Sequence, residues 1–123
     1  MKKLLIVDDS APTRREIRRH LSEARFEQVL EARDGFEALE LFRQHQPELV
    51  TLDLTLPELD GLTCLKQMLA MRPATRVMVI SALSDPETAI AAVELGAVDY
   101  IFKPFTQEEL DEAFQSLVGG ARG

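Results

Sequence analysis

The chain has 123 residues, 46% of them hydrophobic, and its 14 Lys or Arg against 21 Asp or Glu give a net charge of −7. This length predicts one domain, leaves no room for a second, and suffices to bury a core without disulfides or structural metal. The acidic excess disfavours direct DNA binding, while the single Cys64 and the lack of a long apolar N-terminal run favour a cytoplasmic protein with no membrane partner.

The first predicted elements are a strand and a helix. Residues 4–7 are continuously apolar, which is typical of a strand buried on both faces of a parallel sheet. Pro12 suits a helix start, and apolar residues then recur at helical spacing at Ile17, Leu21 and Ala24. The polar side of this helix carries Arg14, Arg15, Arg18 and Arg19. These arginines either face solvent or form part of a surface that docks a partner protein.

The middle of the chain predicts two strands and two helices. Residues 28–32 alternate between apolar and polar, which indicates an edge strand, whereas residues 49–52 form a second continuous apolar run. A helix is predicted over 35–46, and another stops before Pro73. The apolar stripes of these two helices comprise Ala38, Leu39, Phe42, Leu62, Leu65, Met68 and Leu69.

The last third predicts two strands and two helices. Residues 77–80 and 98–102 are apolar runs predicted to be buried on both faces. A helix opens at 85–87 and ends at Gly96 in a left-handed conformation, with Ala89, Ile90 and Val93 pointing inward. The last helix begins at Thr106, which forms a capping box with Glu109. Its predicted core positions are Leu110, Ala113, Phe114 and Leu117.

Five strands alternating with five helices predict a (βα)5 α/β fold, in which right-handed crossovers place helices on both faces of a doubly wound three-layer sandwich. The domain is expected over residues 1–118, with a flexible C-terminal tail at 119–123. Ligands of such sheets bind at the carboxyl ends of the strands.

Polar residues follow the predicted strands at this edge. Asp8 and Asp9 follow the first strand and Asp53 the third, while Ser81 and Lys103 end the fourth and fifth. Three neighbouring carboxylates repel one another, and one lysine cannot neutralise all of them. Mg²⁺ is the natural occupant, because it prefers oxygen ligands and also binds phosphoryl groups.

These residues belong to a longer ordered set of motifs. The set comprises Asp8-Asp9, Asp53, Leu56-Pro57-Glu58-Leu59-Asp60-Gly61, Ser81-Ala82, Gly96-Ala97 and Tyr100-Ile101-Phe102-Lys103-Pro104. Through these motifs, which extend along nearly its whole length, the chain resembles the CheY-like receiver domains of response regulators in two-component signalling. The resemblance implies a flavodoxin-like parallel sheet of strand order 2-1-3-4-5.

The resemblance also implies roles for the site residues. Asp53 would accept a phosphoryl group, and Lys103 would pair with that group beside a cis peptide bond to Pro104. Asp9, Asp53 and the backbone carbonyl of Thr55 would ligate Mg²⁺, or Mn²⁺ as a substitute, with Asp8 acting mainly through water. The domain would be a phosphoacceptor in signalling rather than an enzyme with a separate substrate.

The remaining implied roles concern switching and lifetime. Ser81 and Tyr100 would form a switch pair, in which the ring turns inward from a more exposed position as the hydroxyl binds phosphate. Thr55 and Leu83 would set the rate at which water removes the phosphoryl group. The expected partners are a histidine kinase or phosphotransfer protein and an unidentified target that binds a surface of the fourth helix, fifth strand and fifth helix.

Other readings of the sequence stay open. The chain could be a receiver excised from a larger regulator, a transfer intermediate in a relay, or a binding module that never uses phosphate. A Mg²⁺-dependent aspartyl-phosphate phosphatase is disfavoured, because Thr55 stands where a second Asp would serve as general acid. A flavodoxin-like electron carrier is disfavoured because no phosphate-binding loop rich in Gly, Ser or Thr follows the first strand.

Overall fold

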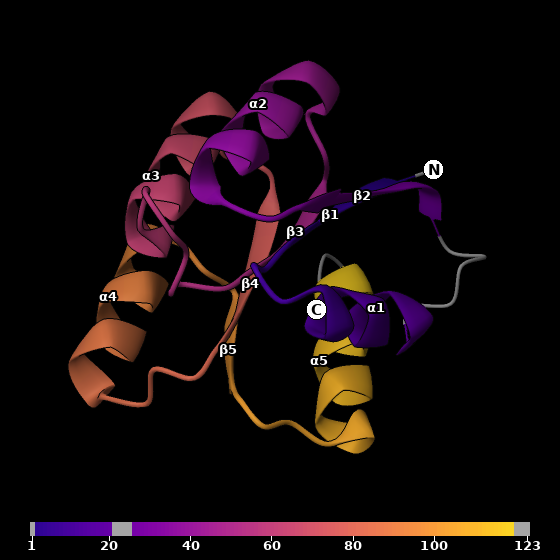
Figure 1. The fold of residues 1–123 in the computed structure, drawn as a ribbon, viewed down its shortest axis with the longest axis vertical. Helices are drawn as coiled ribbons and strands as arrows, with labels where there is room; N and C mark the ends of the chain where they lie inside the picture. Colours follow the sequence, from indigo (N-terminus) through magenta and orange to yellow (C-terminus); the bar gives the residue numbers. More distant parts are fainter. Residues whose placement is uncertain (1, 21–25, 120–123) are drawn as a thin grey trace.

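The computed structural model describes residues 2–20 and 26–119, and within these ranges strands and helices alternate (Figure 1). The elements are β1 (Lys2–Val7), α1 (Ala11–His20), β2 (Phe26–Ala32), α2 (Gly35–His45), β3 (Leu49–Leu52), α3 (Gly61–Met71), β4 (Arg76–Ser81), α4 (Pro86–Leu95), β5 (Asp99–Phe102) and α5 (Gln107–Gly119). The predicted (βα)5 order is confirmed.

The five strands form one parallel sheet in the order β2-β1-β3-β4-β5. Helices α1 and α5 cover one face, and α2, α3 and α4 cover the other (Figure 1). This is the predicted doubly wound three-layer sandwich, with β2 at an edge as expected. The strand order reverses between β1 and β3, so the crevice at this point opens at the carboxyl ends of both strands.

Each face of the sheet has its own core. Because successive side chains of a strand point to opposite faces, Leu5 and Val7 of β1 pack beneath α2 and α3, while Leu4 and Ile6 pack beneath α1 and α5. β3 and β4 alternate in the same way. Burying one such side chain stabilises the fold by about 1.5–3 kcal/mol. The continuous apolar runs of β1, β3 and β4 therefore supply both cores at once.

Local signals set the ends of the helices. The side chains of Asp34, Asp60 and Asp85 accept hydrogen bonds from backbone N–H groups at the starts of α2, α3 and α4. The predicted capping box of α5 is confirmed by reciprocal hydrogen bonds between Thr106 and Glu109. The left-handed end of α4 is also confirmed, with φ of 118° at Gly96.

The burial predicted for α4 and β5 is wrong in part. Ile90 and Val93 are each 55% exposed, and Ala92 is the buried residue of α4. On β5, Val98 just before the strand is 50% exposed and Phe102 is 47% exposed. The reason is that β5 is a short edge strand, so α4 packs against α3 and β5 through a narrow small-residue stripe. Ile90 and Val93 of α4 face outward as a result.

Some predictions fall outside the described residues. Leu21 and Ala24, expected on the first helix, lie there, as do residues 120–123 of the expected tail. Gly119, the first residue assigned to that tail, still belongs to α5. Within the described ranges, no helix combines the length and apolar character needed to cross a bilayer.

Candidate functional site

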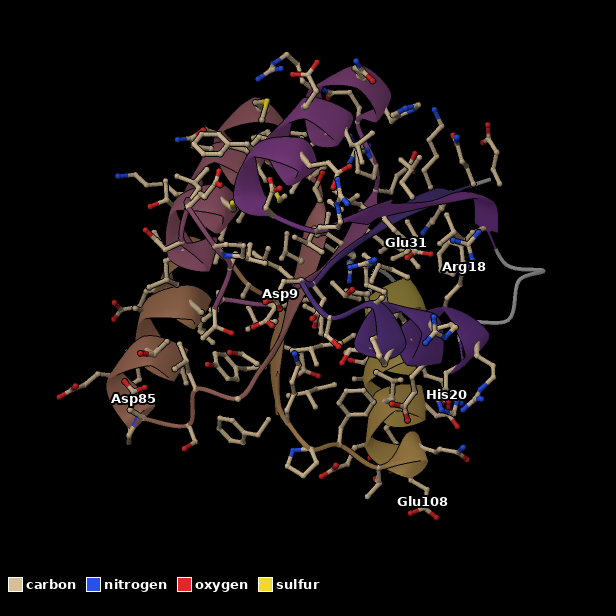
Figure 2. The ribbon with its side chains drawn as sticks, viewed as in Figure 1. Asp9, Arg18, His20, Glu31, Asp85 and Glu108 are labelled. Carbon is tan, nitrogen blue, oxygen red and sulfur yellow. The ribbon has the colours of Figure 1, made fainter. Side chains whose placement is uncertain are left out.

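Two buried carboxylates mark the point where the strand order reverses. Asp8 and Asp53 directly follow the neighbouring strands β1 and β3, and backbone hydrogen bonds from their N–H groups to Ala32 and Val7 continue the sheet ladder. Only 1% of Asp8 and 2% of Asp53 is exposed. Asp9 is exposed and lies at the end of β1, in the centre of the view in Figure 2.

The predicted acidic cluster is assembled in the structure. Oxygen atoms of Asp8, Asp9 and Asp53 all lie within 4.8 Å of one another. The ammonium of Lys103 donates to Asp8 Oδ2 at 2.8 Å and to Asp53 Oδ2 at 2.9 Å. Three carboxylates and one ammonium give the cluster a net charge of −2 when all four groups are ionised.

Burial and pairing act against each other in this cluster. Burial raises the pKa of Asp8, and the hydrogen bond from Lys103 only partly offsets this effect. Burial opposes the charged form of Lys103, but its hydrogen bonds to Asp8 and Asp53 outweigh this and raise the pKa of the ammonium. Lys103 therefore stays charged, while Asp8 retains an unfavourable charge at neutral pH.

Short local contacts orient the carboxylates. The Ser10 N–H donates to Asp8 Oδ1 at 2.9 Å. The N–H and the hydroxyl of Thr55 both donate to Asp53 Oδ1 at 3.0 Å. Both oxygens of Asp53 are thus occupied, Oδ1 by Thr55 and Oδ2 by Lys103, which fixes the plane of the carboxylate.

The backbone also places Lys103 and the loop after β3. The Lys103 N–H donates to the Ser81 carbonyl at 2.9 Å, and the Lys103–Pro104 peptide bond is cis. Gly61 donates to the Leu54 carbonyl at 3.1 Å, which folds the start of α3 against the segment after Asp53. A Cβ at position 61 would come within 2.4 Å of the Leu54 Cα and 2.7 Å of the Asp53 carbonyl oxygen, so only glycine fits there.

The backbone of Leu83 links Ser81 to Tyr100. Its N–H donates to the buried Ser81 hydroxyl at 3.2 Å, and its carbonyl accepts from the Tyr100 hydroxyl at 2.7 Å. Tyr100 is half-buried among the apolar residues beneath α4. The two residues expected to form a switch therefore share one partner, a role of Leu83 that its apolar side chain did not indicate.

Arg14, which the sequence analysis named only as one of four arginines on the first helix, also contacts the site. Its Nη1 donates to the Asp8 carbonyl at 2.7 Å and its Nε to Glu31 at 2.9 Å, while Arg18 also binds Glu31. Figure 2 shows Arg18 and Glu31 on facing elements, α1 and β2. The sequence does not distinguish Arg14 and Arg18 from Arg15 and Arg19, because their shared partner Glu31 lies on the neighbouring strand β2. Arg15 and Arg19 remain exposed.

The donor set of the cluster suits a hard divalent cation. All three acidic side chains offer oxygen atoms, two of them are buried, and the cluster carries uncompensated negative charge. These are the properties that favour Mg²⁺, which takes carboxylate oxygens while keeping part of its water shell. The exposed Asp9 leaves one side of the cluster open to such an ion and its waters.

The chain matches the model of a known family. The family model described as the response regulator receiver domain matches residues 4–115 of the chain. The chain belongs to this family. The receiver is 40% identical over 116 residues to the chemotaxis protein CheY of Bacillus subtilis (strain 168), a match that covers 94% of this chain and 97% of that protein.

Solved structures agree with this assignment. A CheY-like response regulator receiver domain protein from Methanospirillum hungatei JF-1 has a TM-score of 0.90 and 23% identity, covering 99% of this chain and 97% of that one. A chain of the CheX-CheY-BeF3-Mg²⁺ complex from Borrelia burgdorferi has a TM-score of 0.88 and 31% identity, and the match covers 95% of this chain and 89% of that one. The protein is thus a response-regulator receiver, a signalling domain with a flavodoxin-like fold.

Proposed function

We propose that this receiver accepts a phosphoryl group on Asp53 from a phosphohistidine of a kinase or phosphotransfer protein. The observation that carries the proposal is the fixed, buried Asp53 carboxylate, paired with Lys103 and clustered with Asp8 and Asp9. An oxygen of Asp53 attacks phosphorus, the new P–O bond forms, and the P–N bond breaks. The imidazole leaves with the electron pair of that bond and takes up a proton.

Asp9, Asp53 and the Thr55 backbone carbonyl would hold Mg²⁺, or Mn²⁺ in its place, with Asp8 acting mainly through water. When bound, the ion supplies positive charge that offsets repulsion between the carboxylate and the incoming phosphate. Lys103 is already charged and within hydrogen-bond distance of Asp53. It can therefore exchange its carboxylate partner for an oxygen of the arriving phosphoryl group.

Arg15 and Arg19 on α1 are proposed to assist docking of the phosphodonor. Both are exposed on the helix that follows the site, whereas Arg14 and Arg18 are occupied by Glu31. Reversing the charge of Arg15 and Arg19 together is expected to slow transfer from a phosphorylated kinase without slowing reaction with acetyl phosphate. Equal slowing with both donors, or unchanged transfer from the kinase, would contradict docking through α1.

Switching is proposed to run through Ser81, Leu83 and Tyr100. A phosphoryl group on Asp53 offers the Ser81 O–H a charged acceptor, and turning the hydroxyl toward it would draw the Ser81 oxygen away from the Leu83 N–H, whose hydrogen bond it now accepts. Movement of the loop at Leu83 also affects its carbonyl, the partner of the Tyr100 hydroxyl. Phosphorylation would thus shift the population of states at α4, β5 and α5, the surface that meets the output partner.

The lifetime of the phosphoryl group is proposed to depend on Thr55 and Leu83. Neither side chain is an acid or amide suited to orient an attacking water. The double variant Thr55→Asn/Leu83→Glu is therefore expected to lose phosphate faster than the parent chain. A parent decay as fast as that of the variant, measured by intact mass over time, would contradict this assignment.

The phosphoacceptor is tested by intact mass after incubation with acetyl phosphate and Mg²⁺. One added phosphate is expected, lost when the metal is removed by EDTA and absent in Asp53→Asn. Asp111→Asn on α5, an exposed position outside the site, serves as the matched control and should be phosphorylated like the parent. No adduct with any donor, or an adduct that persists in Asp53→Asn, would overturn the proposal.

A further inference from the structure

Charge is distributed very unevenly along the chain. Residues 77–119, which include α4, β5 and α5, contain eight carboxylates and a single basic residue, Lys103. The rest of the chain has 13 basic and 13 acidic residues, so this segment accounts for the whole net charge of −7. Since Lys103 binds Asp8 and Asp53, its charge is directed into the site. The outer surface of α4, β5 and α5 is therefore strongly acidic.

The same surface carries most of the large exposed apolar side chains of the described residues. Ile90 and Val93 project from α4, and Val98 and Phe102 lie at the two ends of β5. The ring of Phe102 lies 5.2 Å from that of Tyr100, centroid to centroid. Beside them is an open groove of about 450 Å³ between β5 and α5. This groove is lined by Asp99, Tyr100, Ile101, Phe102, Pro104, Glu109, Glu112 and Ala113.

Carboxylates surround this apolar surface. Glu87 and Glu94 are exposed on α4, and Glu109 and Glu112 line the groove from α5. Figure 2 shows Asp85 and Glu108 at the outer ends of the helices on either side of β5. Within residues 2–20 and 26–119, none of these side chains forms an ion pair with Lys or Arg. An apolar centre with an unneutralised acidic border calls for an apolar ligand with a basic border.

We propose that the face formed by α4, β5 and α5 binds a cationic amphipathic segment of a partner protein, in which Lys or Arg residues flank apolar anchors. The anchors contact Phe102 and Ile90, and the cations pair with carboxylates such as Glu94 and Glu112. That this face is the output surface of the receiver rests on the proposed function. A second copy of this chain is a poor occupant, because two such faces would meet as like charges.

The probe is a fluorescein-labelled amphipathic helix of about 18 Lys and Leu residues, with a Glu/Leu helix of the same pattern as the opposite-charge control. Fluorescence anisotropy measures affinity, and NMR chemical shifts locate the contact. The Lys/Leu helix is expected to bind at residues 87–112 and the Glu/Leu helix to bind at least about tenfold more weakly. Binding should also weaken as NaCl rises from about 0.05 M to about 0.3 M, because the screening length falls.

Matched variants separate the face from the rest of the surface. Glu94→Lys/Glu112→Lys is expected to weaken binding on the order of tenfold, whereas Glu27→Lys/Glu40→Lys, with the same charge change on β2 and α2, should weaken it far less. Phe102→Ala should weaken binding, whereas Phe36→Ala, an exposed phenylalanine on α2, should not. Since all six positions are partly or fully exposed, far-UV circular dichroism should stay unchanged.

Several results would overturn the proposal. Equal binding of the two helices, equal losses in the two double variants, or shifts centred away from α4, β5 and α5 would do so. So would sedimentation showing that the chain dimerises through this face. Repeating the titration after acetyl phosphate treatment tests the output role. Failure to phosphorylate Asp53 would refute the proposed function, but binding to the untreated chain would still decide whether this face accepts a cationic segment.

Discussion

Replacing Lys103 with Met is expected to destabilise the metal-free receiver substantially at neutral pH. The change keeps a side chain of similar length but removes the ammonium that lies 2.8 Å from Asp8 and 2.9 Å from Asp53. Both carboxylates are almost fully buried, so their charges would be left uncompensated. Removing one partner of a buried ion pair costs about 3–5 kcal/mol, and the 21% exposure of the Lys103 side chain favours the lower value of about 3 kcal/mol.

The pH dependence of the stability loss caused by Lys103→Met provides a sharper test than the size of the loss at one pH. Burial already raises the pKa of Asp8, and removing Lys103 would raise it further. A group whose pKa is raised in the folded state favours folding in its protonated form and disfavours it as pH rises. The cost of Lys103→Met should therefore be largest near pH 7 and shrink toward about pH 4, as Asp8 takes up a proton.

Thermal unfolding in EDTA, followed by far-UV circular dichroism because the chain has no Trp, measures this cost. A loss of about 3 kcal/mol corresponds to a fall in Tm of roughly 12 °C for a chain of this length. Adding Asp8→Asn to Lys103→Met should recover much of the loss, and Lys66→Met on the exposed face of α3 is the control. A loss below about 1 kcal/mol, or one that does not change with pH, would refute the account of the site's electrostatics.

Four further outcomes are expected. Gly61→Ala should cost about 3 kcal/mol and slow phosphorylation by acetyl phosphate, because the new methyl group overlaps the backbone beside Asp53. An unchanged Tm would contradict this. Burial opposes ionisation of Glu31, but hydrogen bonds from Arg14 and Arg18 outweigh this and lower its pKa below the usual 4.5. Glu31→Gln should therefore cost about 1 kcal/mol of stability at pH 7, and this cost should disappear as the pH falls through the lowered pKa of Glu31. A cost that is the same at pH 7 and below that pKa would count against this account. Burial raises the pKa of Cys64 to about 11, so its thiol should react with Ellman's reagent far more slowly in the native chain than in guanidinium. Thr51→Val should raise stability by about 1 kcal/mol in urea titrations, because the buried Thr51 hydroxyl has no hydrogen-bond partner among the described residues; a destabilised variant would indicate a partner such as water.

The fold could be predicted because local patterns and global topology agree. The continuous runs at β1, β3 and β4 have no polar face, so only a sheet covered on both sides can bury them. Once those strands are parallel, the residues that follow them must meet at one edge. For this reason Asp8, Asp53 and Lys103 could be placed together from sequence, although they are up to 95 residues apart.

Contacts made through the backbone could not be predicted in this way. The carbonyl of Leu83 accepts from Tyr100, and the carbonyl of Asp8 accepts from Arg14, yet every residue has a carbonyl. Residue type does not distinguish the one that is used. In the sequence, Arg14 and Arg18 cannot be told apart from Arg15 and Arg19. Only the ion pairs that Arg14 and Arg18 form with Glu31 of the neighbouring strand β2 distinguish them.

The errors at α4 and β5 have a different cause. Apolar periodicity predicts burial because exposed apolar surface is normally unfavourable, so Ile90, Val93 and Phe102 were expected inside the fold. The structure instead leaves all three exposed, and Phe102 lines an open groove between β5 and α5 to which Asp99, Glu109 and Glu112 also contribute. A sequence that keeps large apolar side chains where its own fold cannot cover them favours association with another surface. The places where burial was predicted wrongly are therefore the places where this receiver is expected to meet its partner.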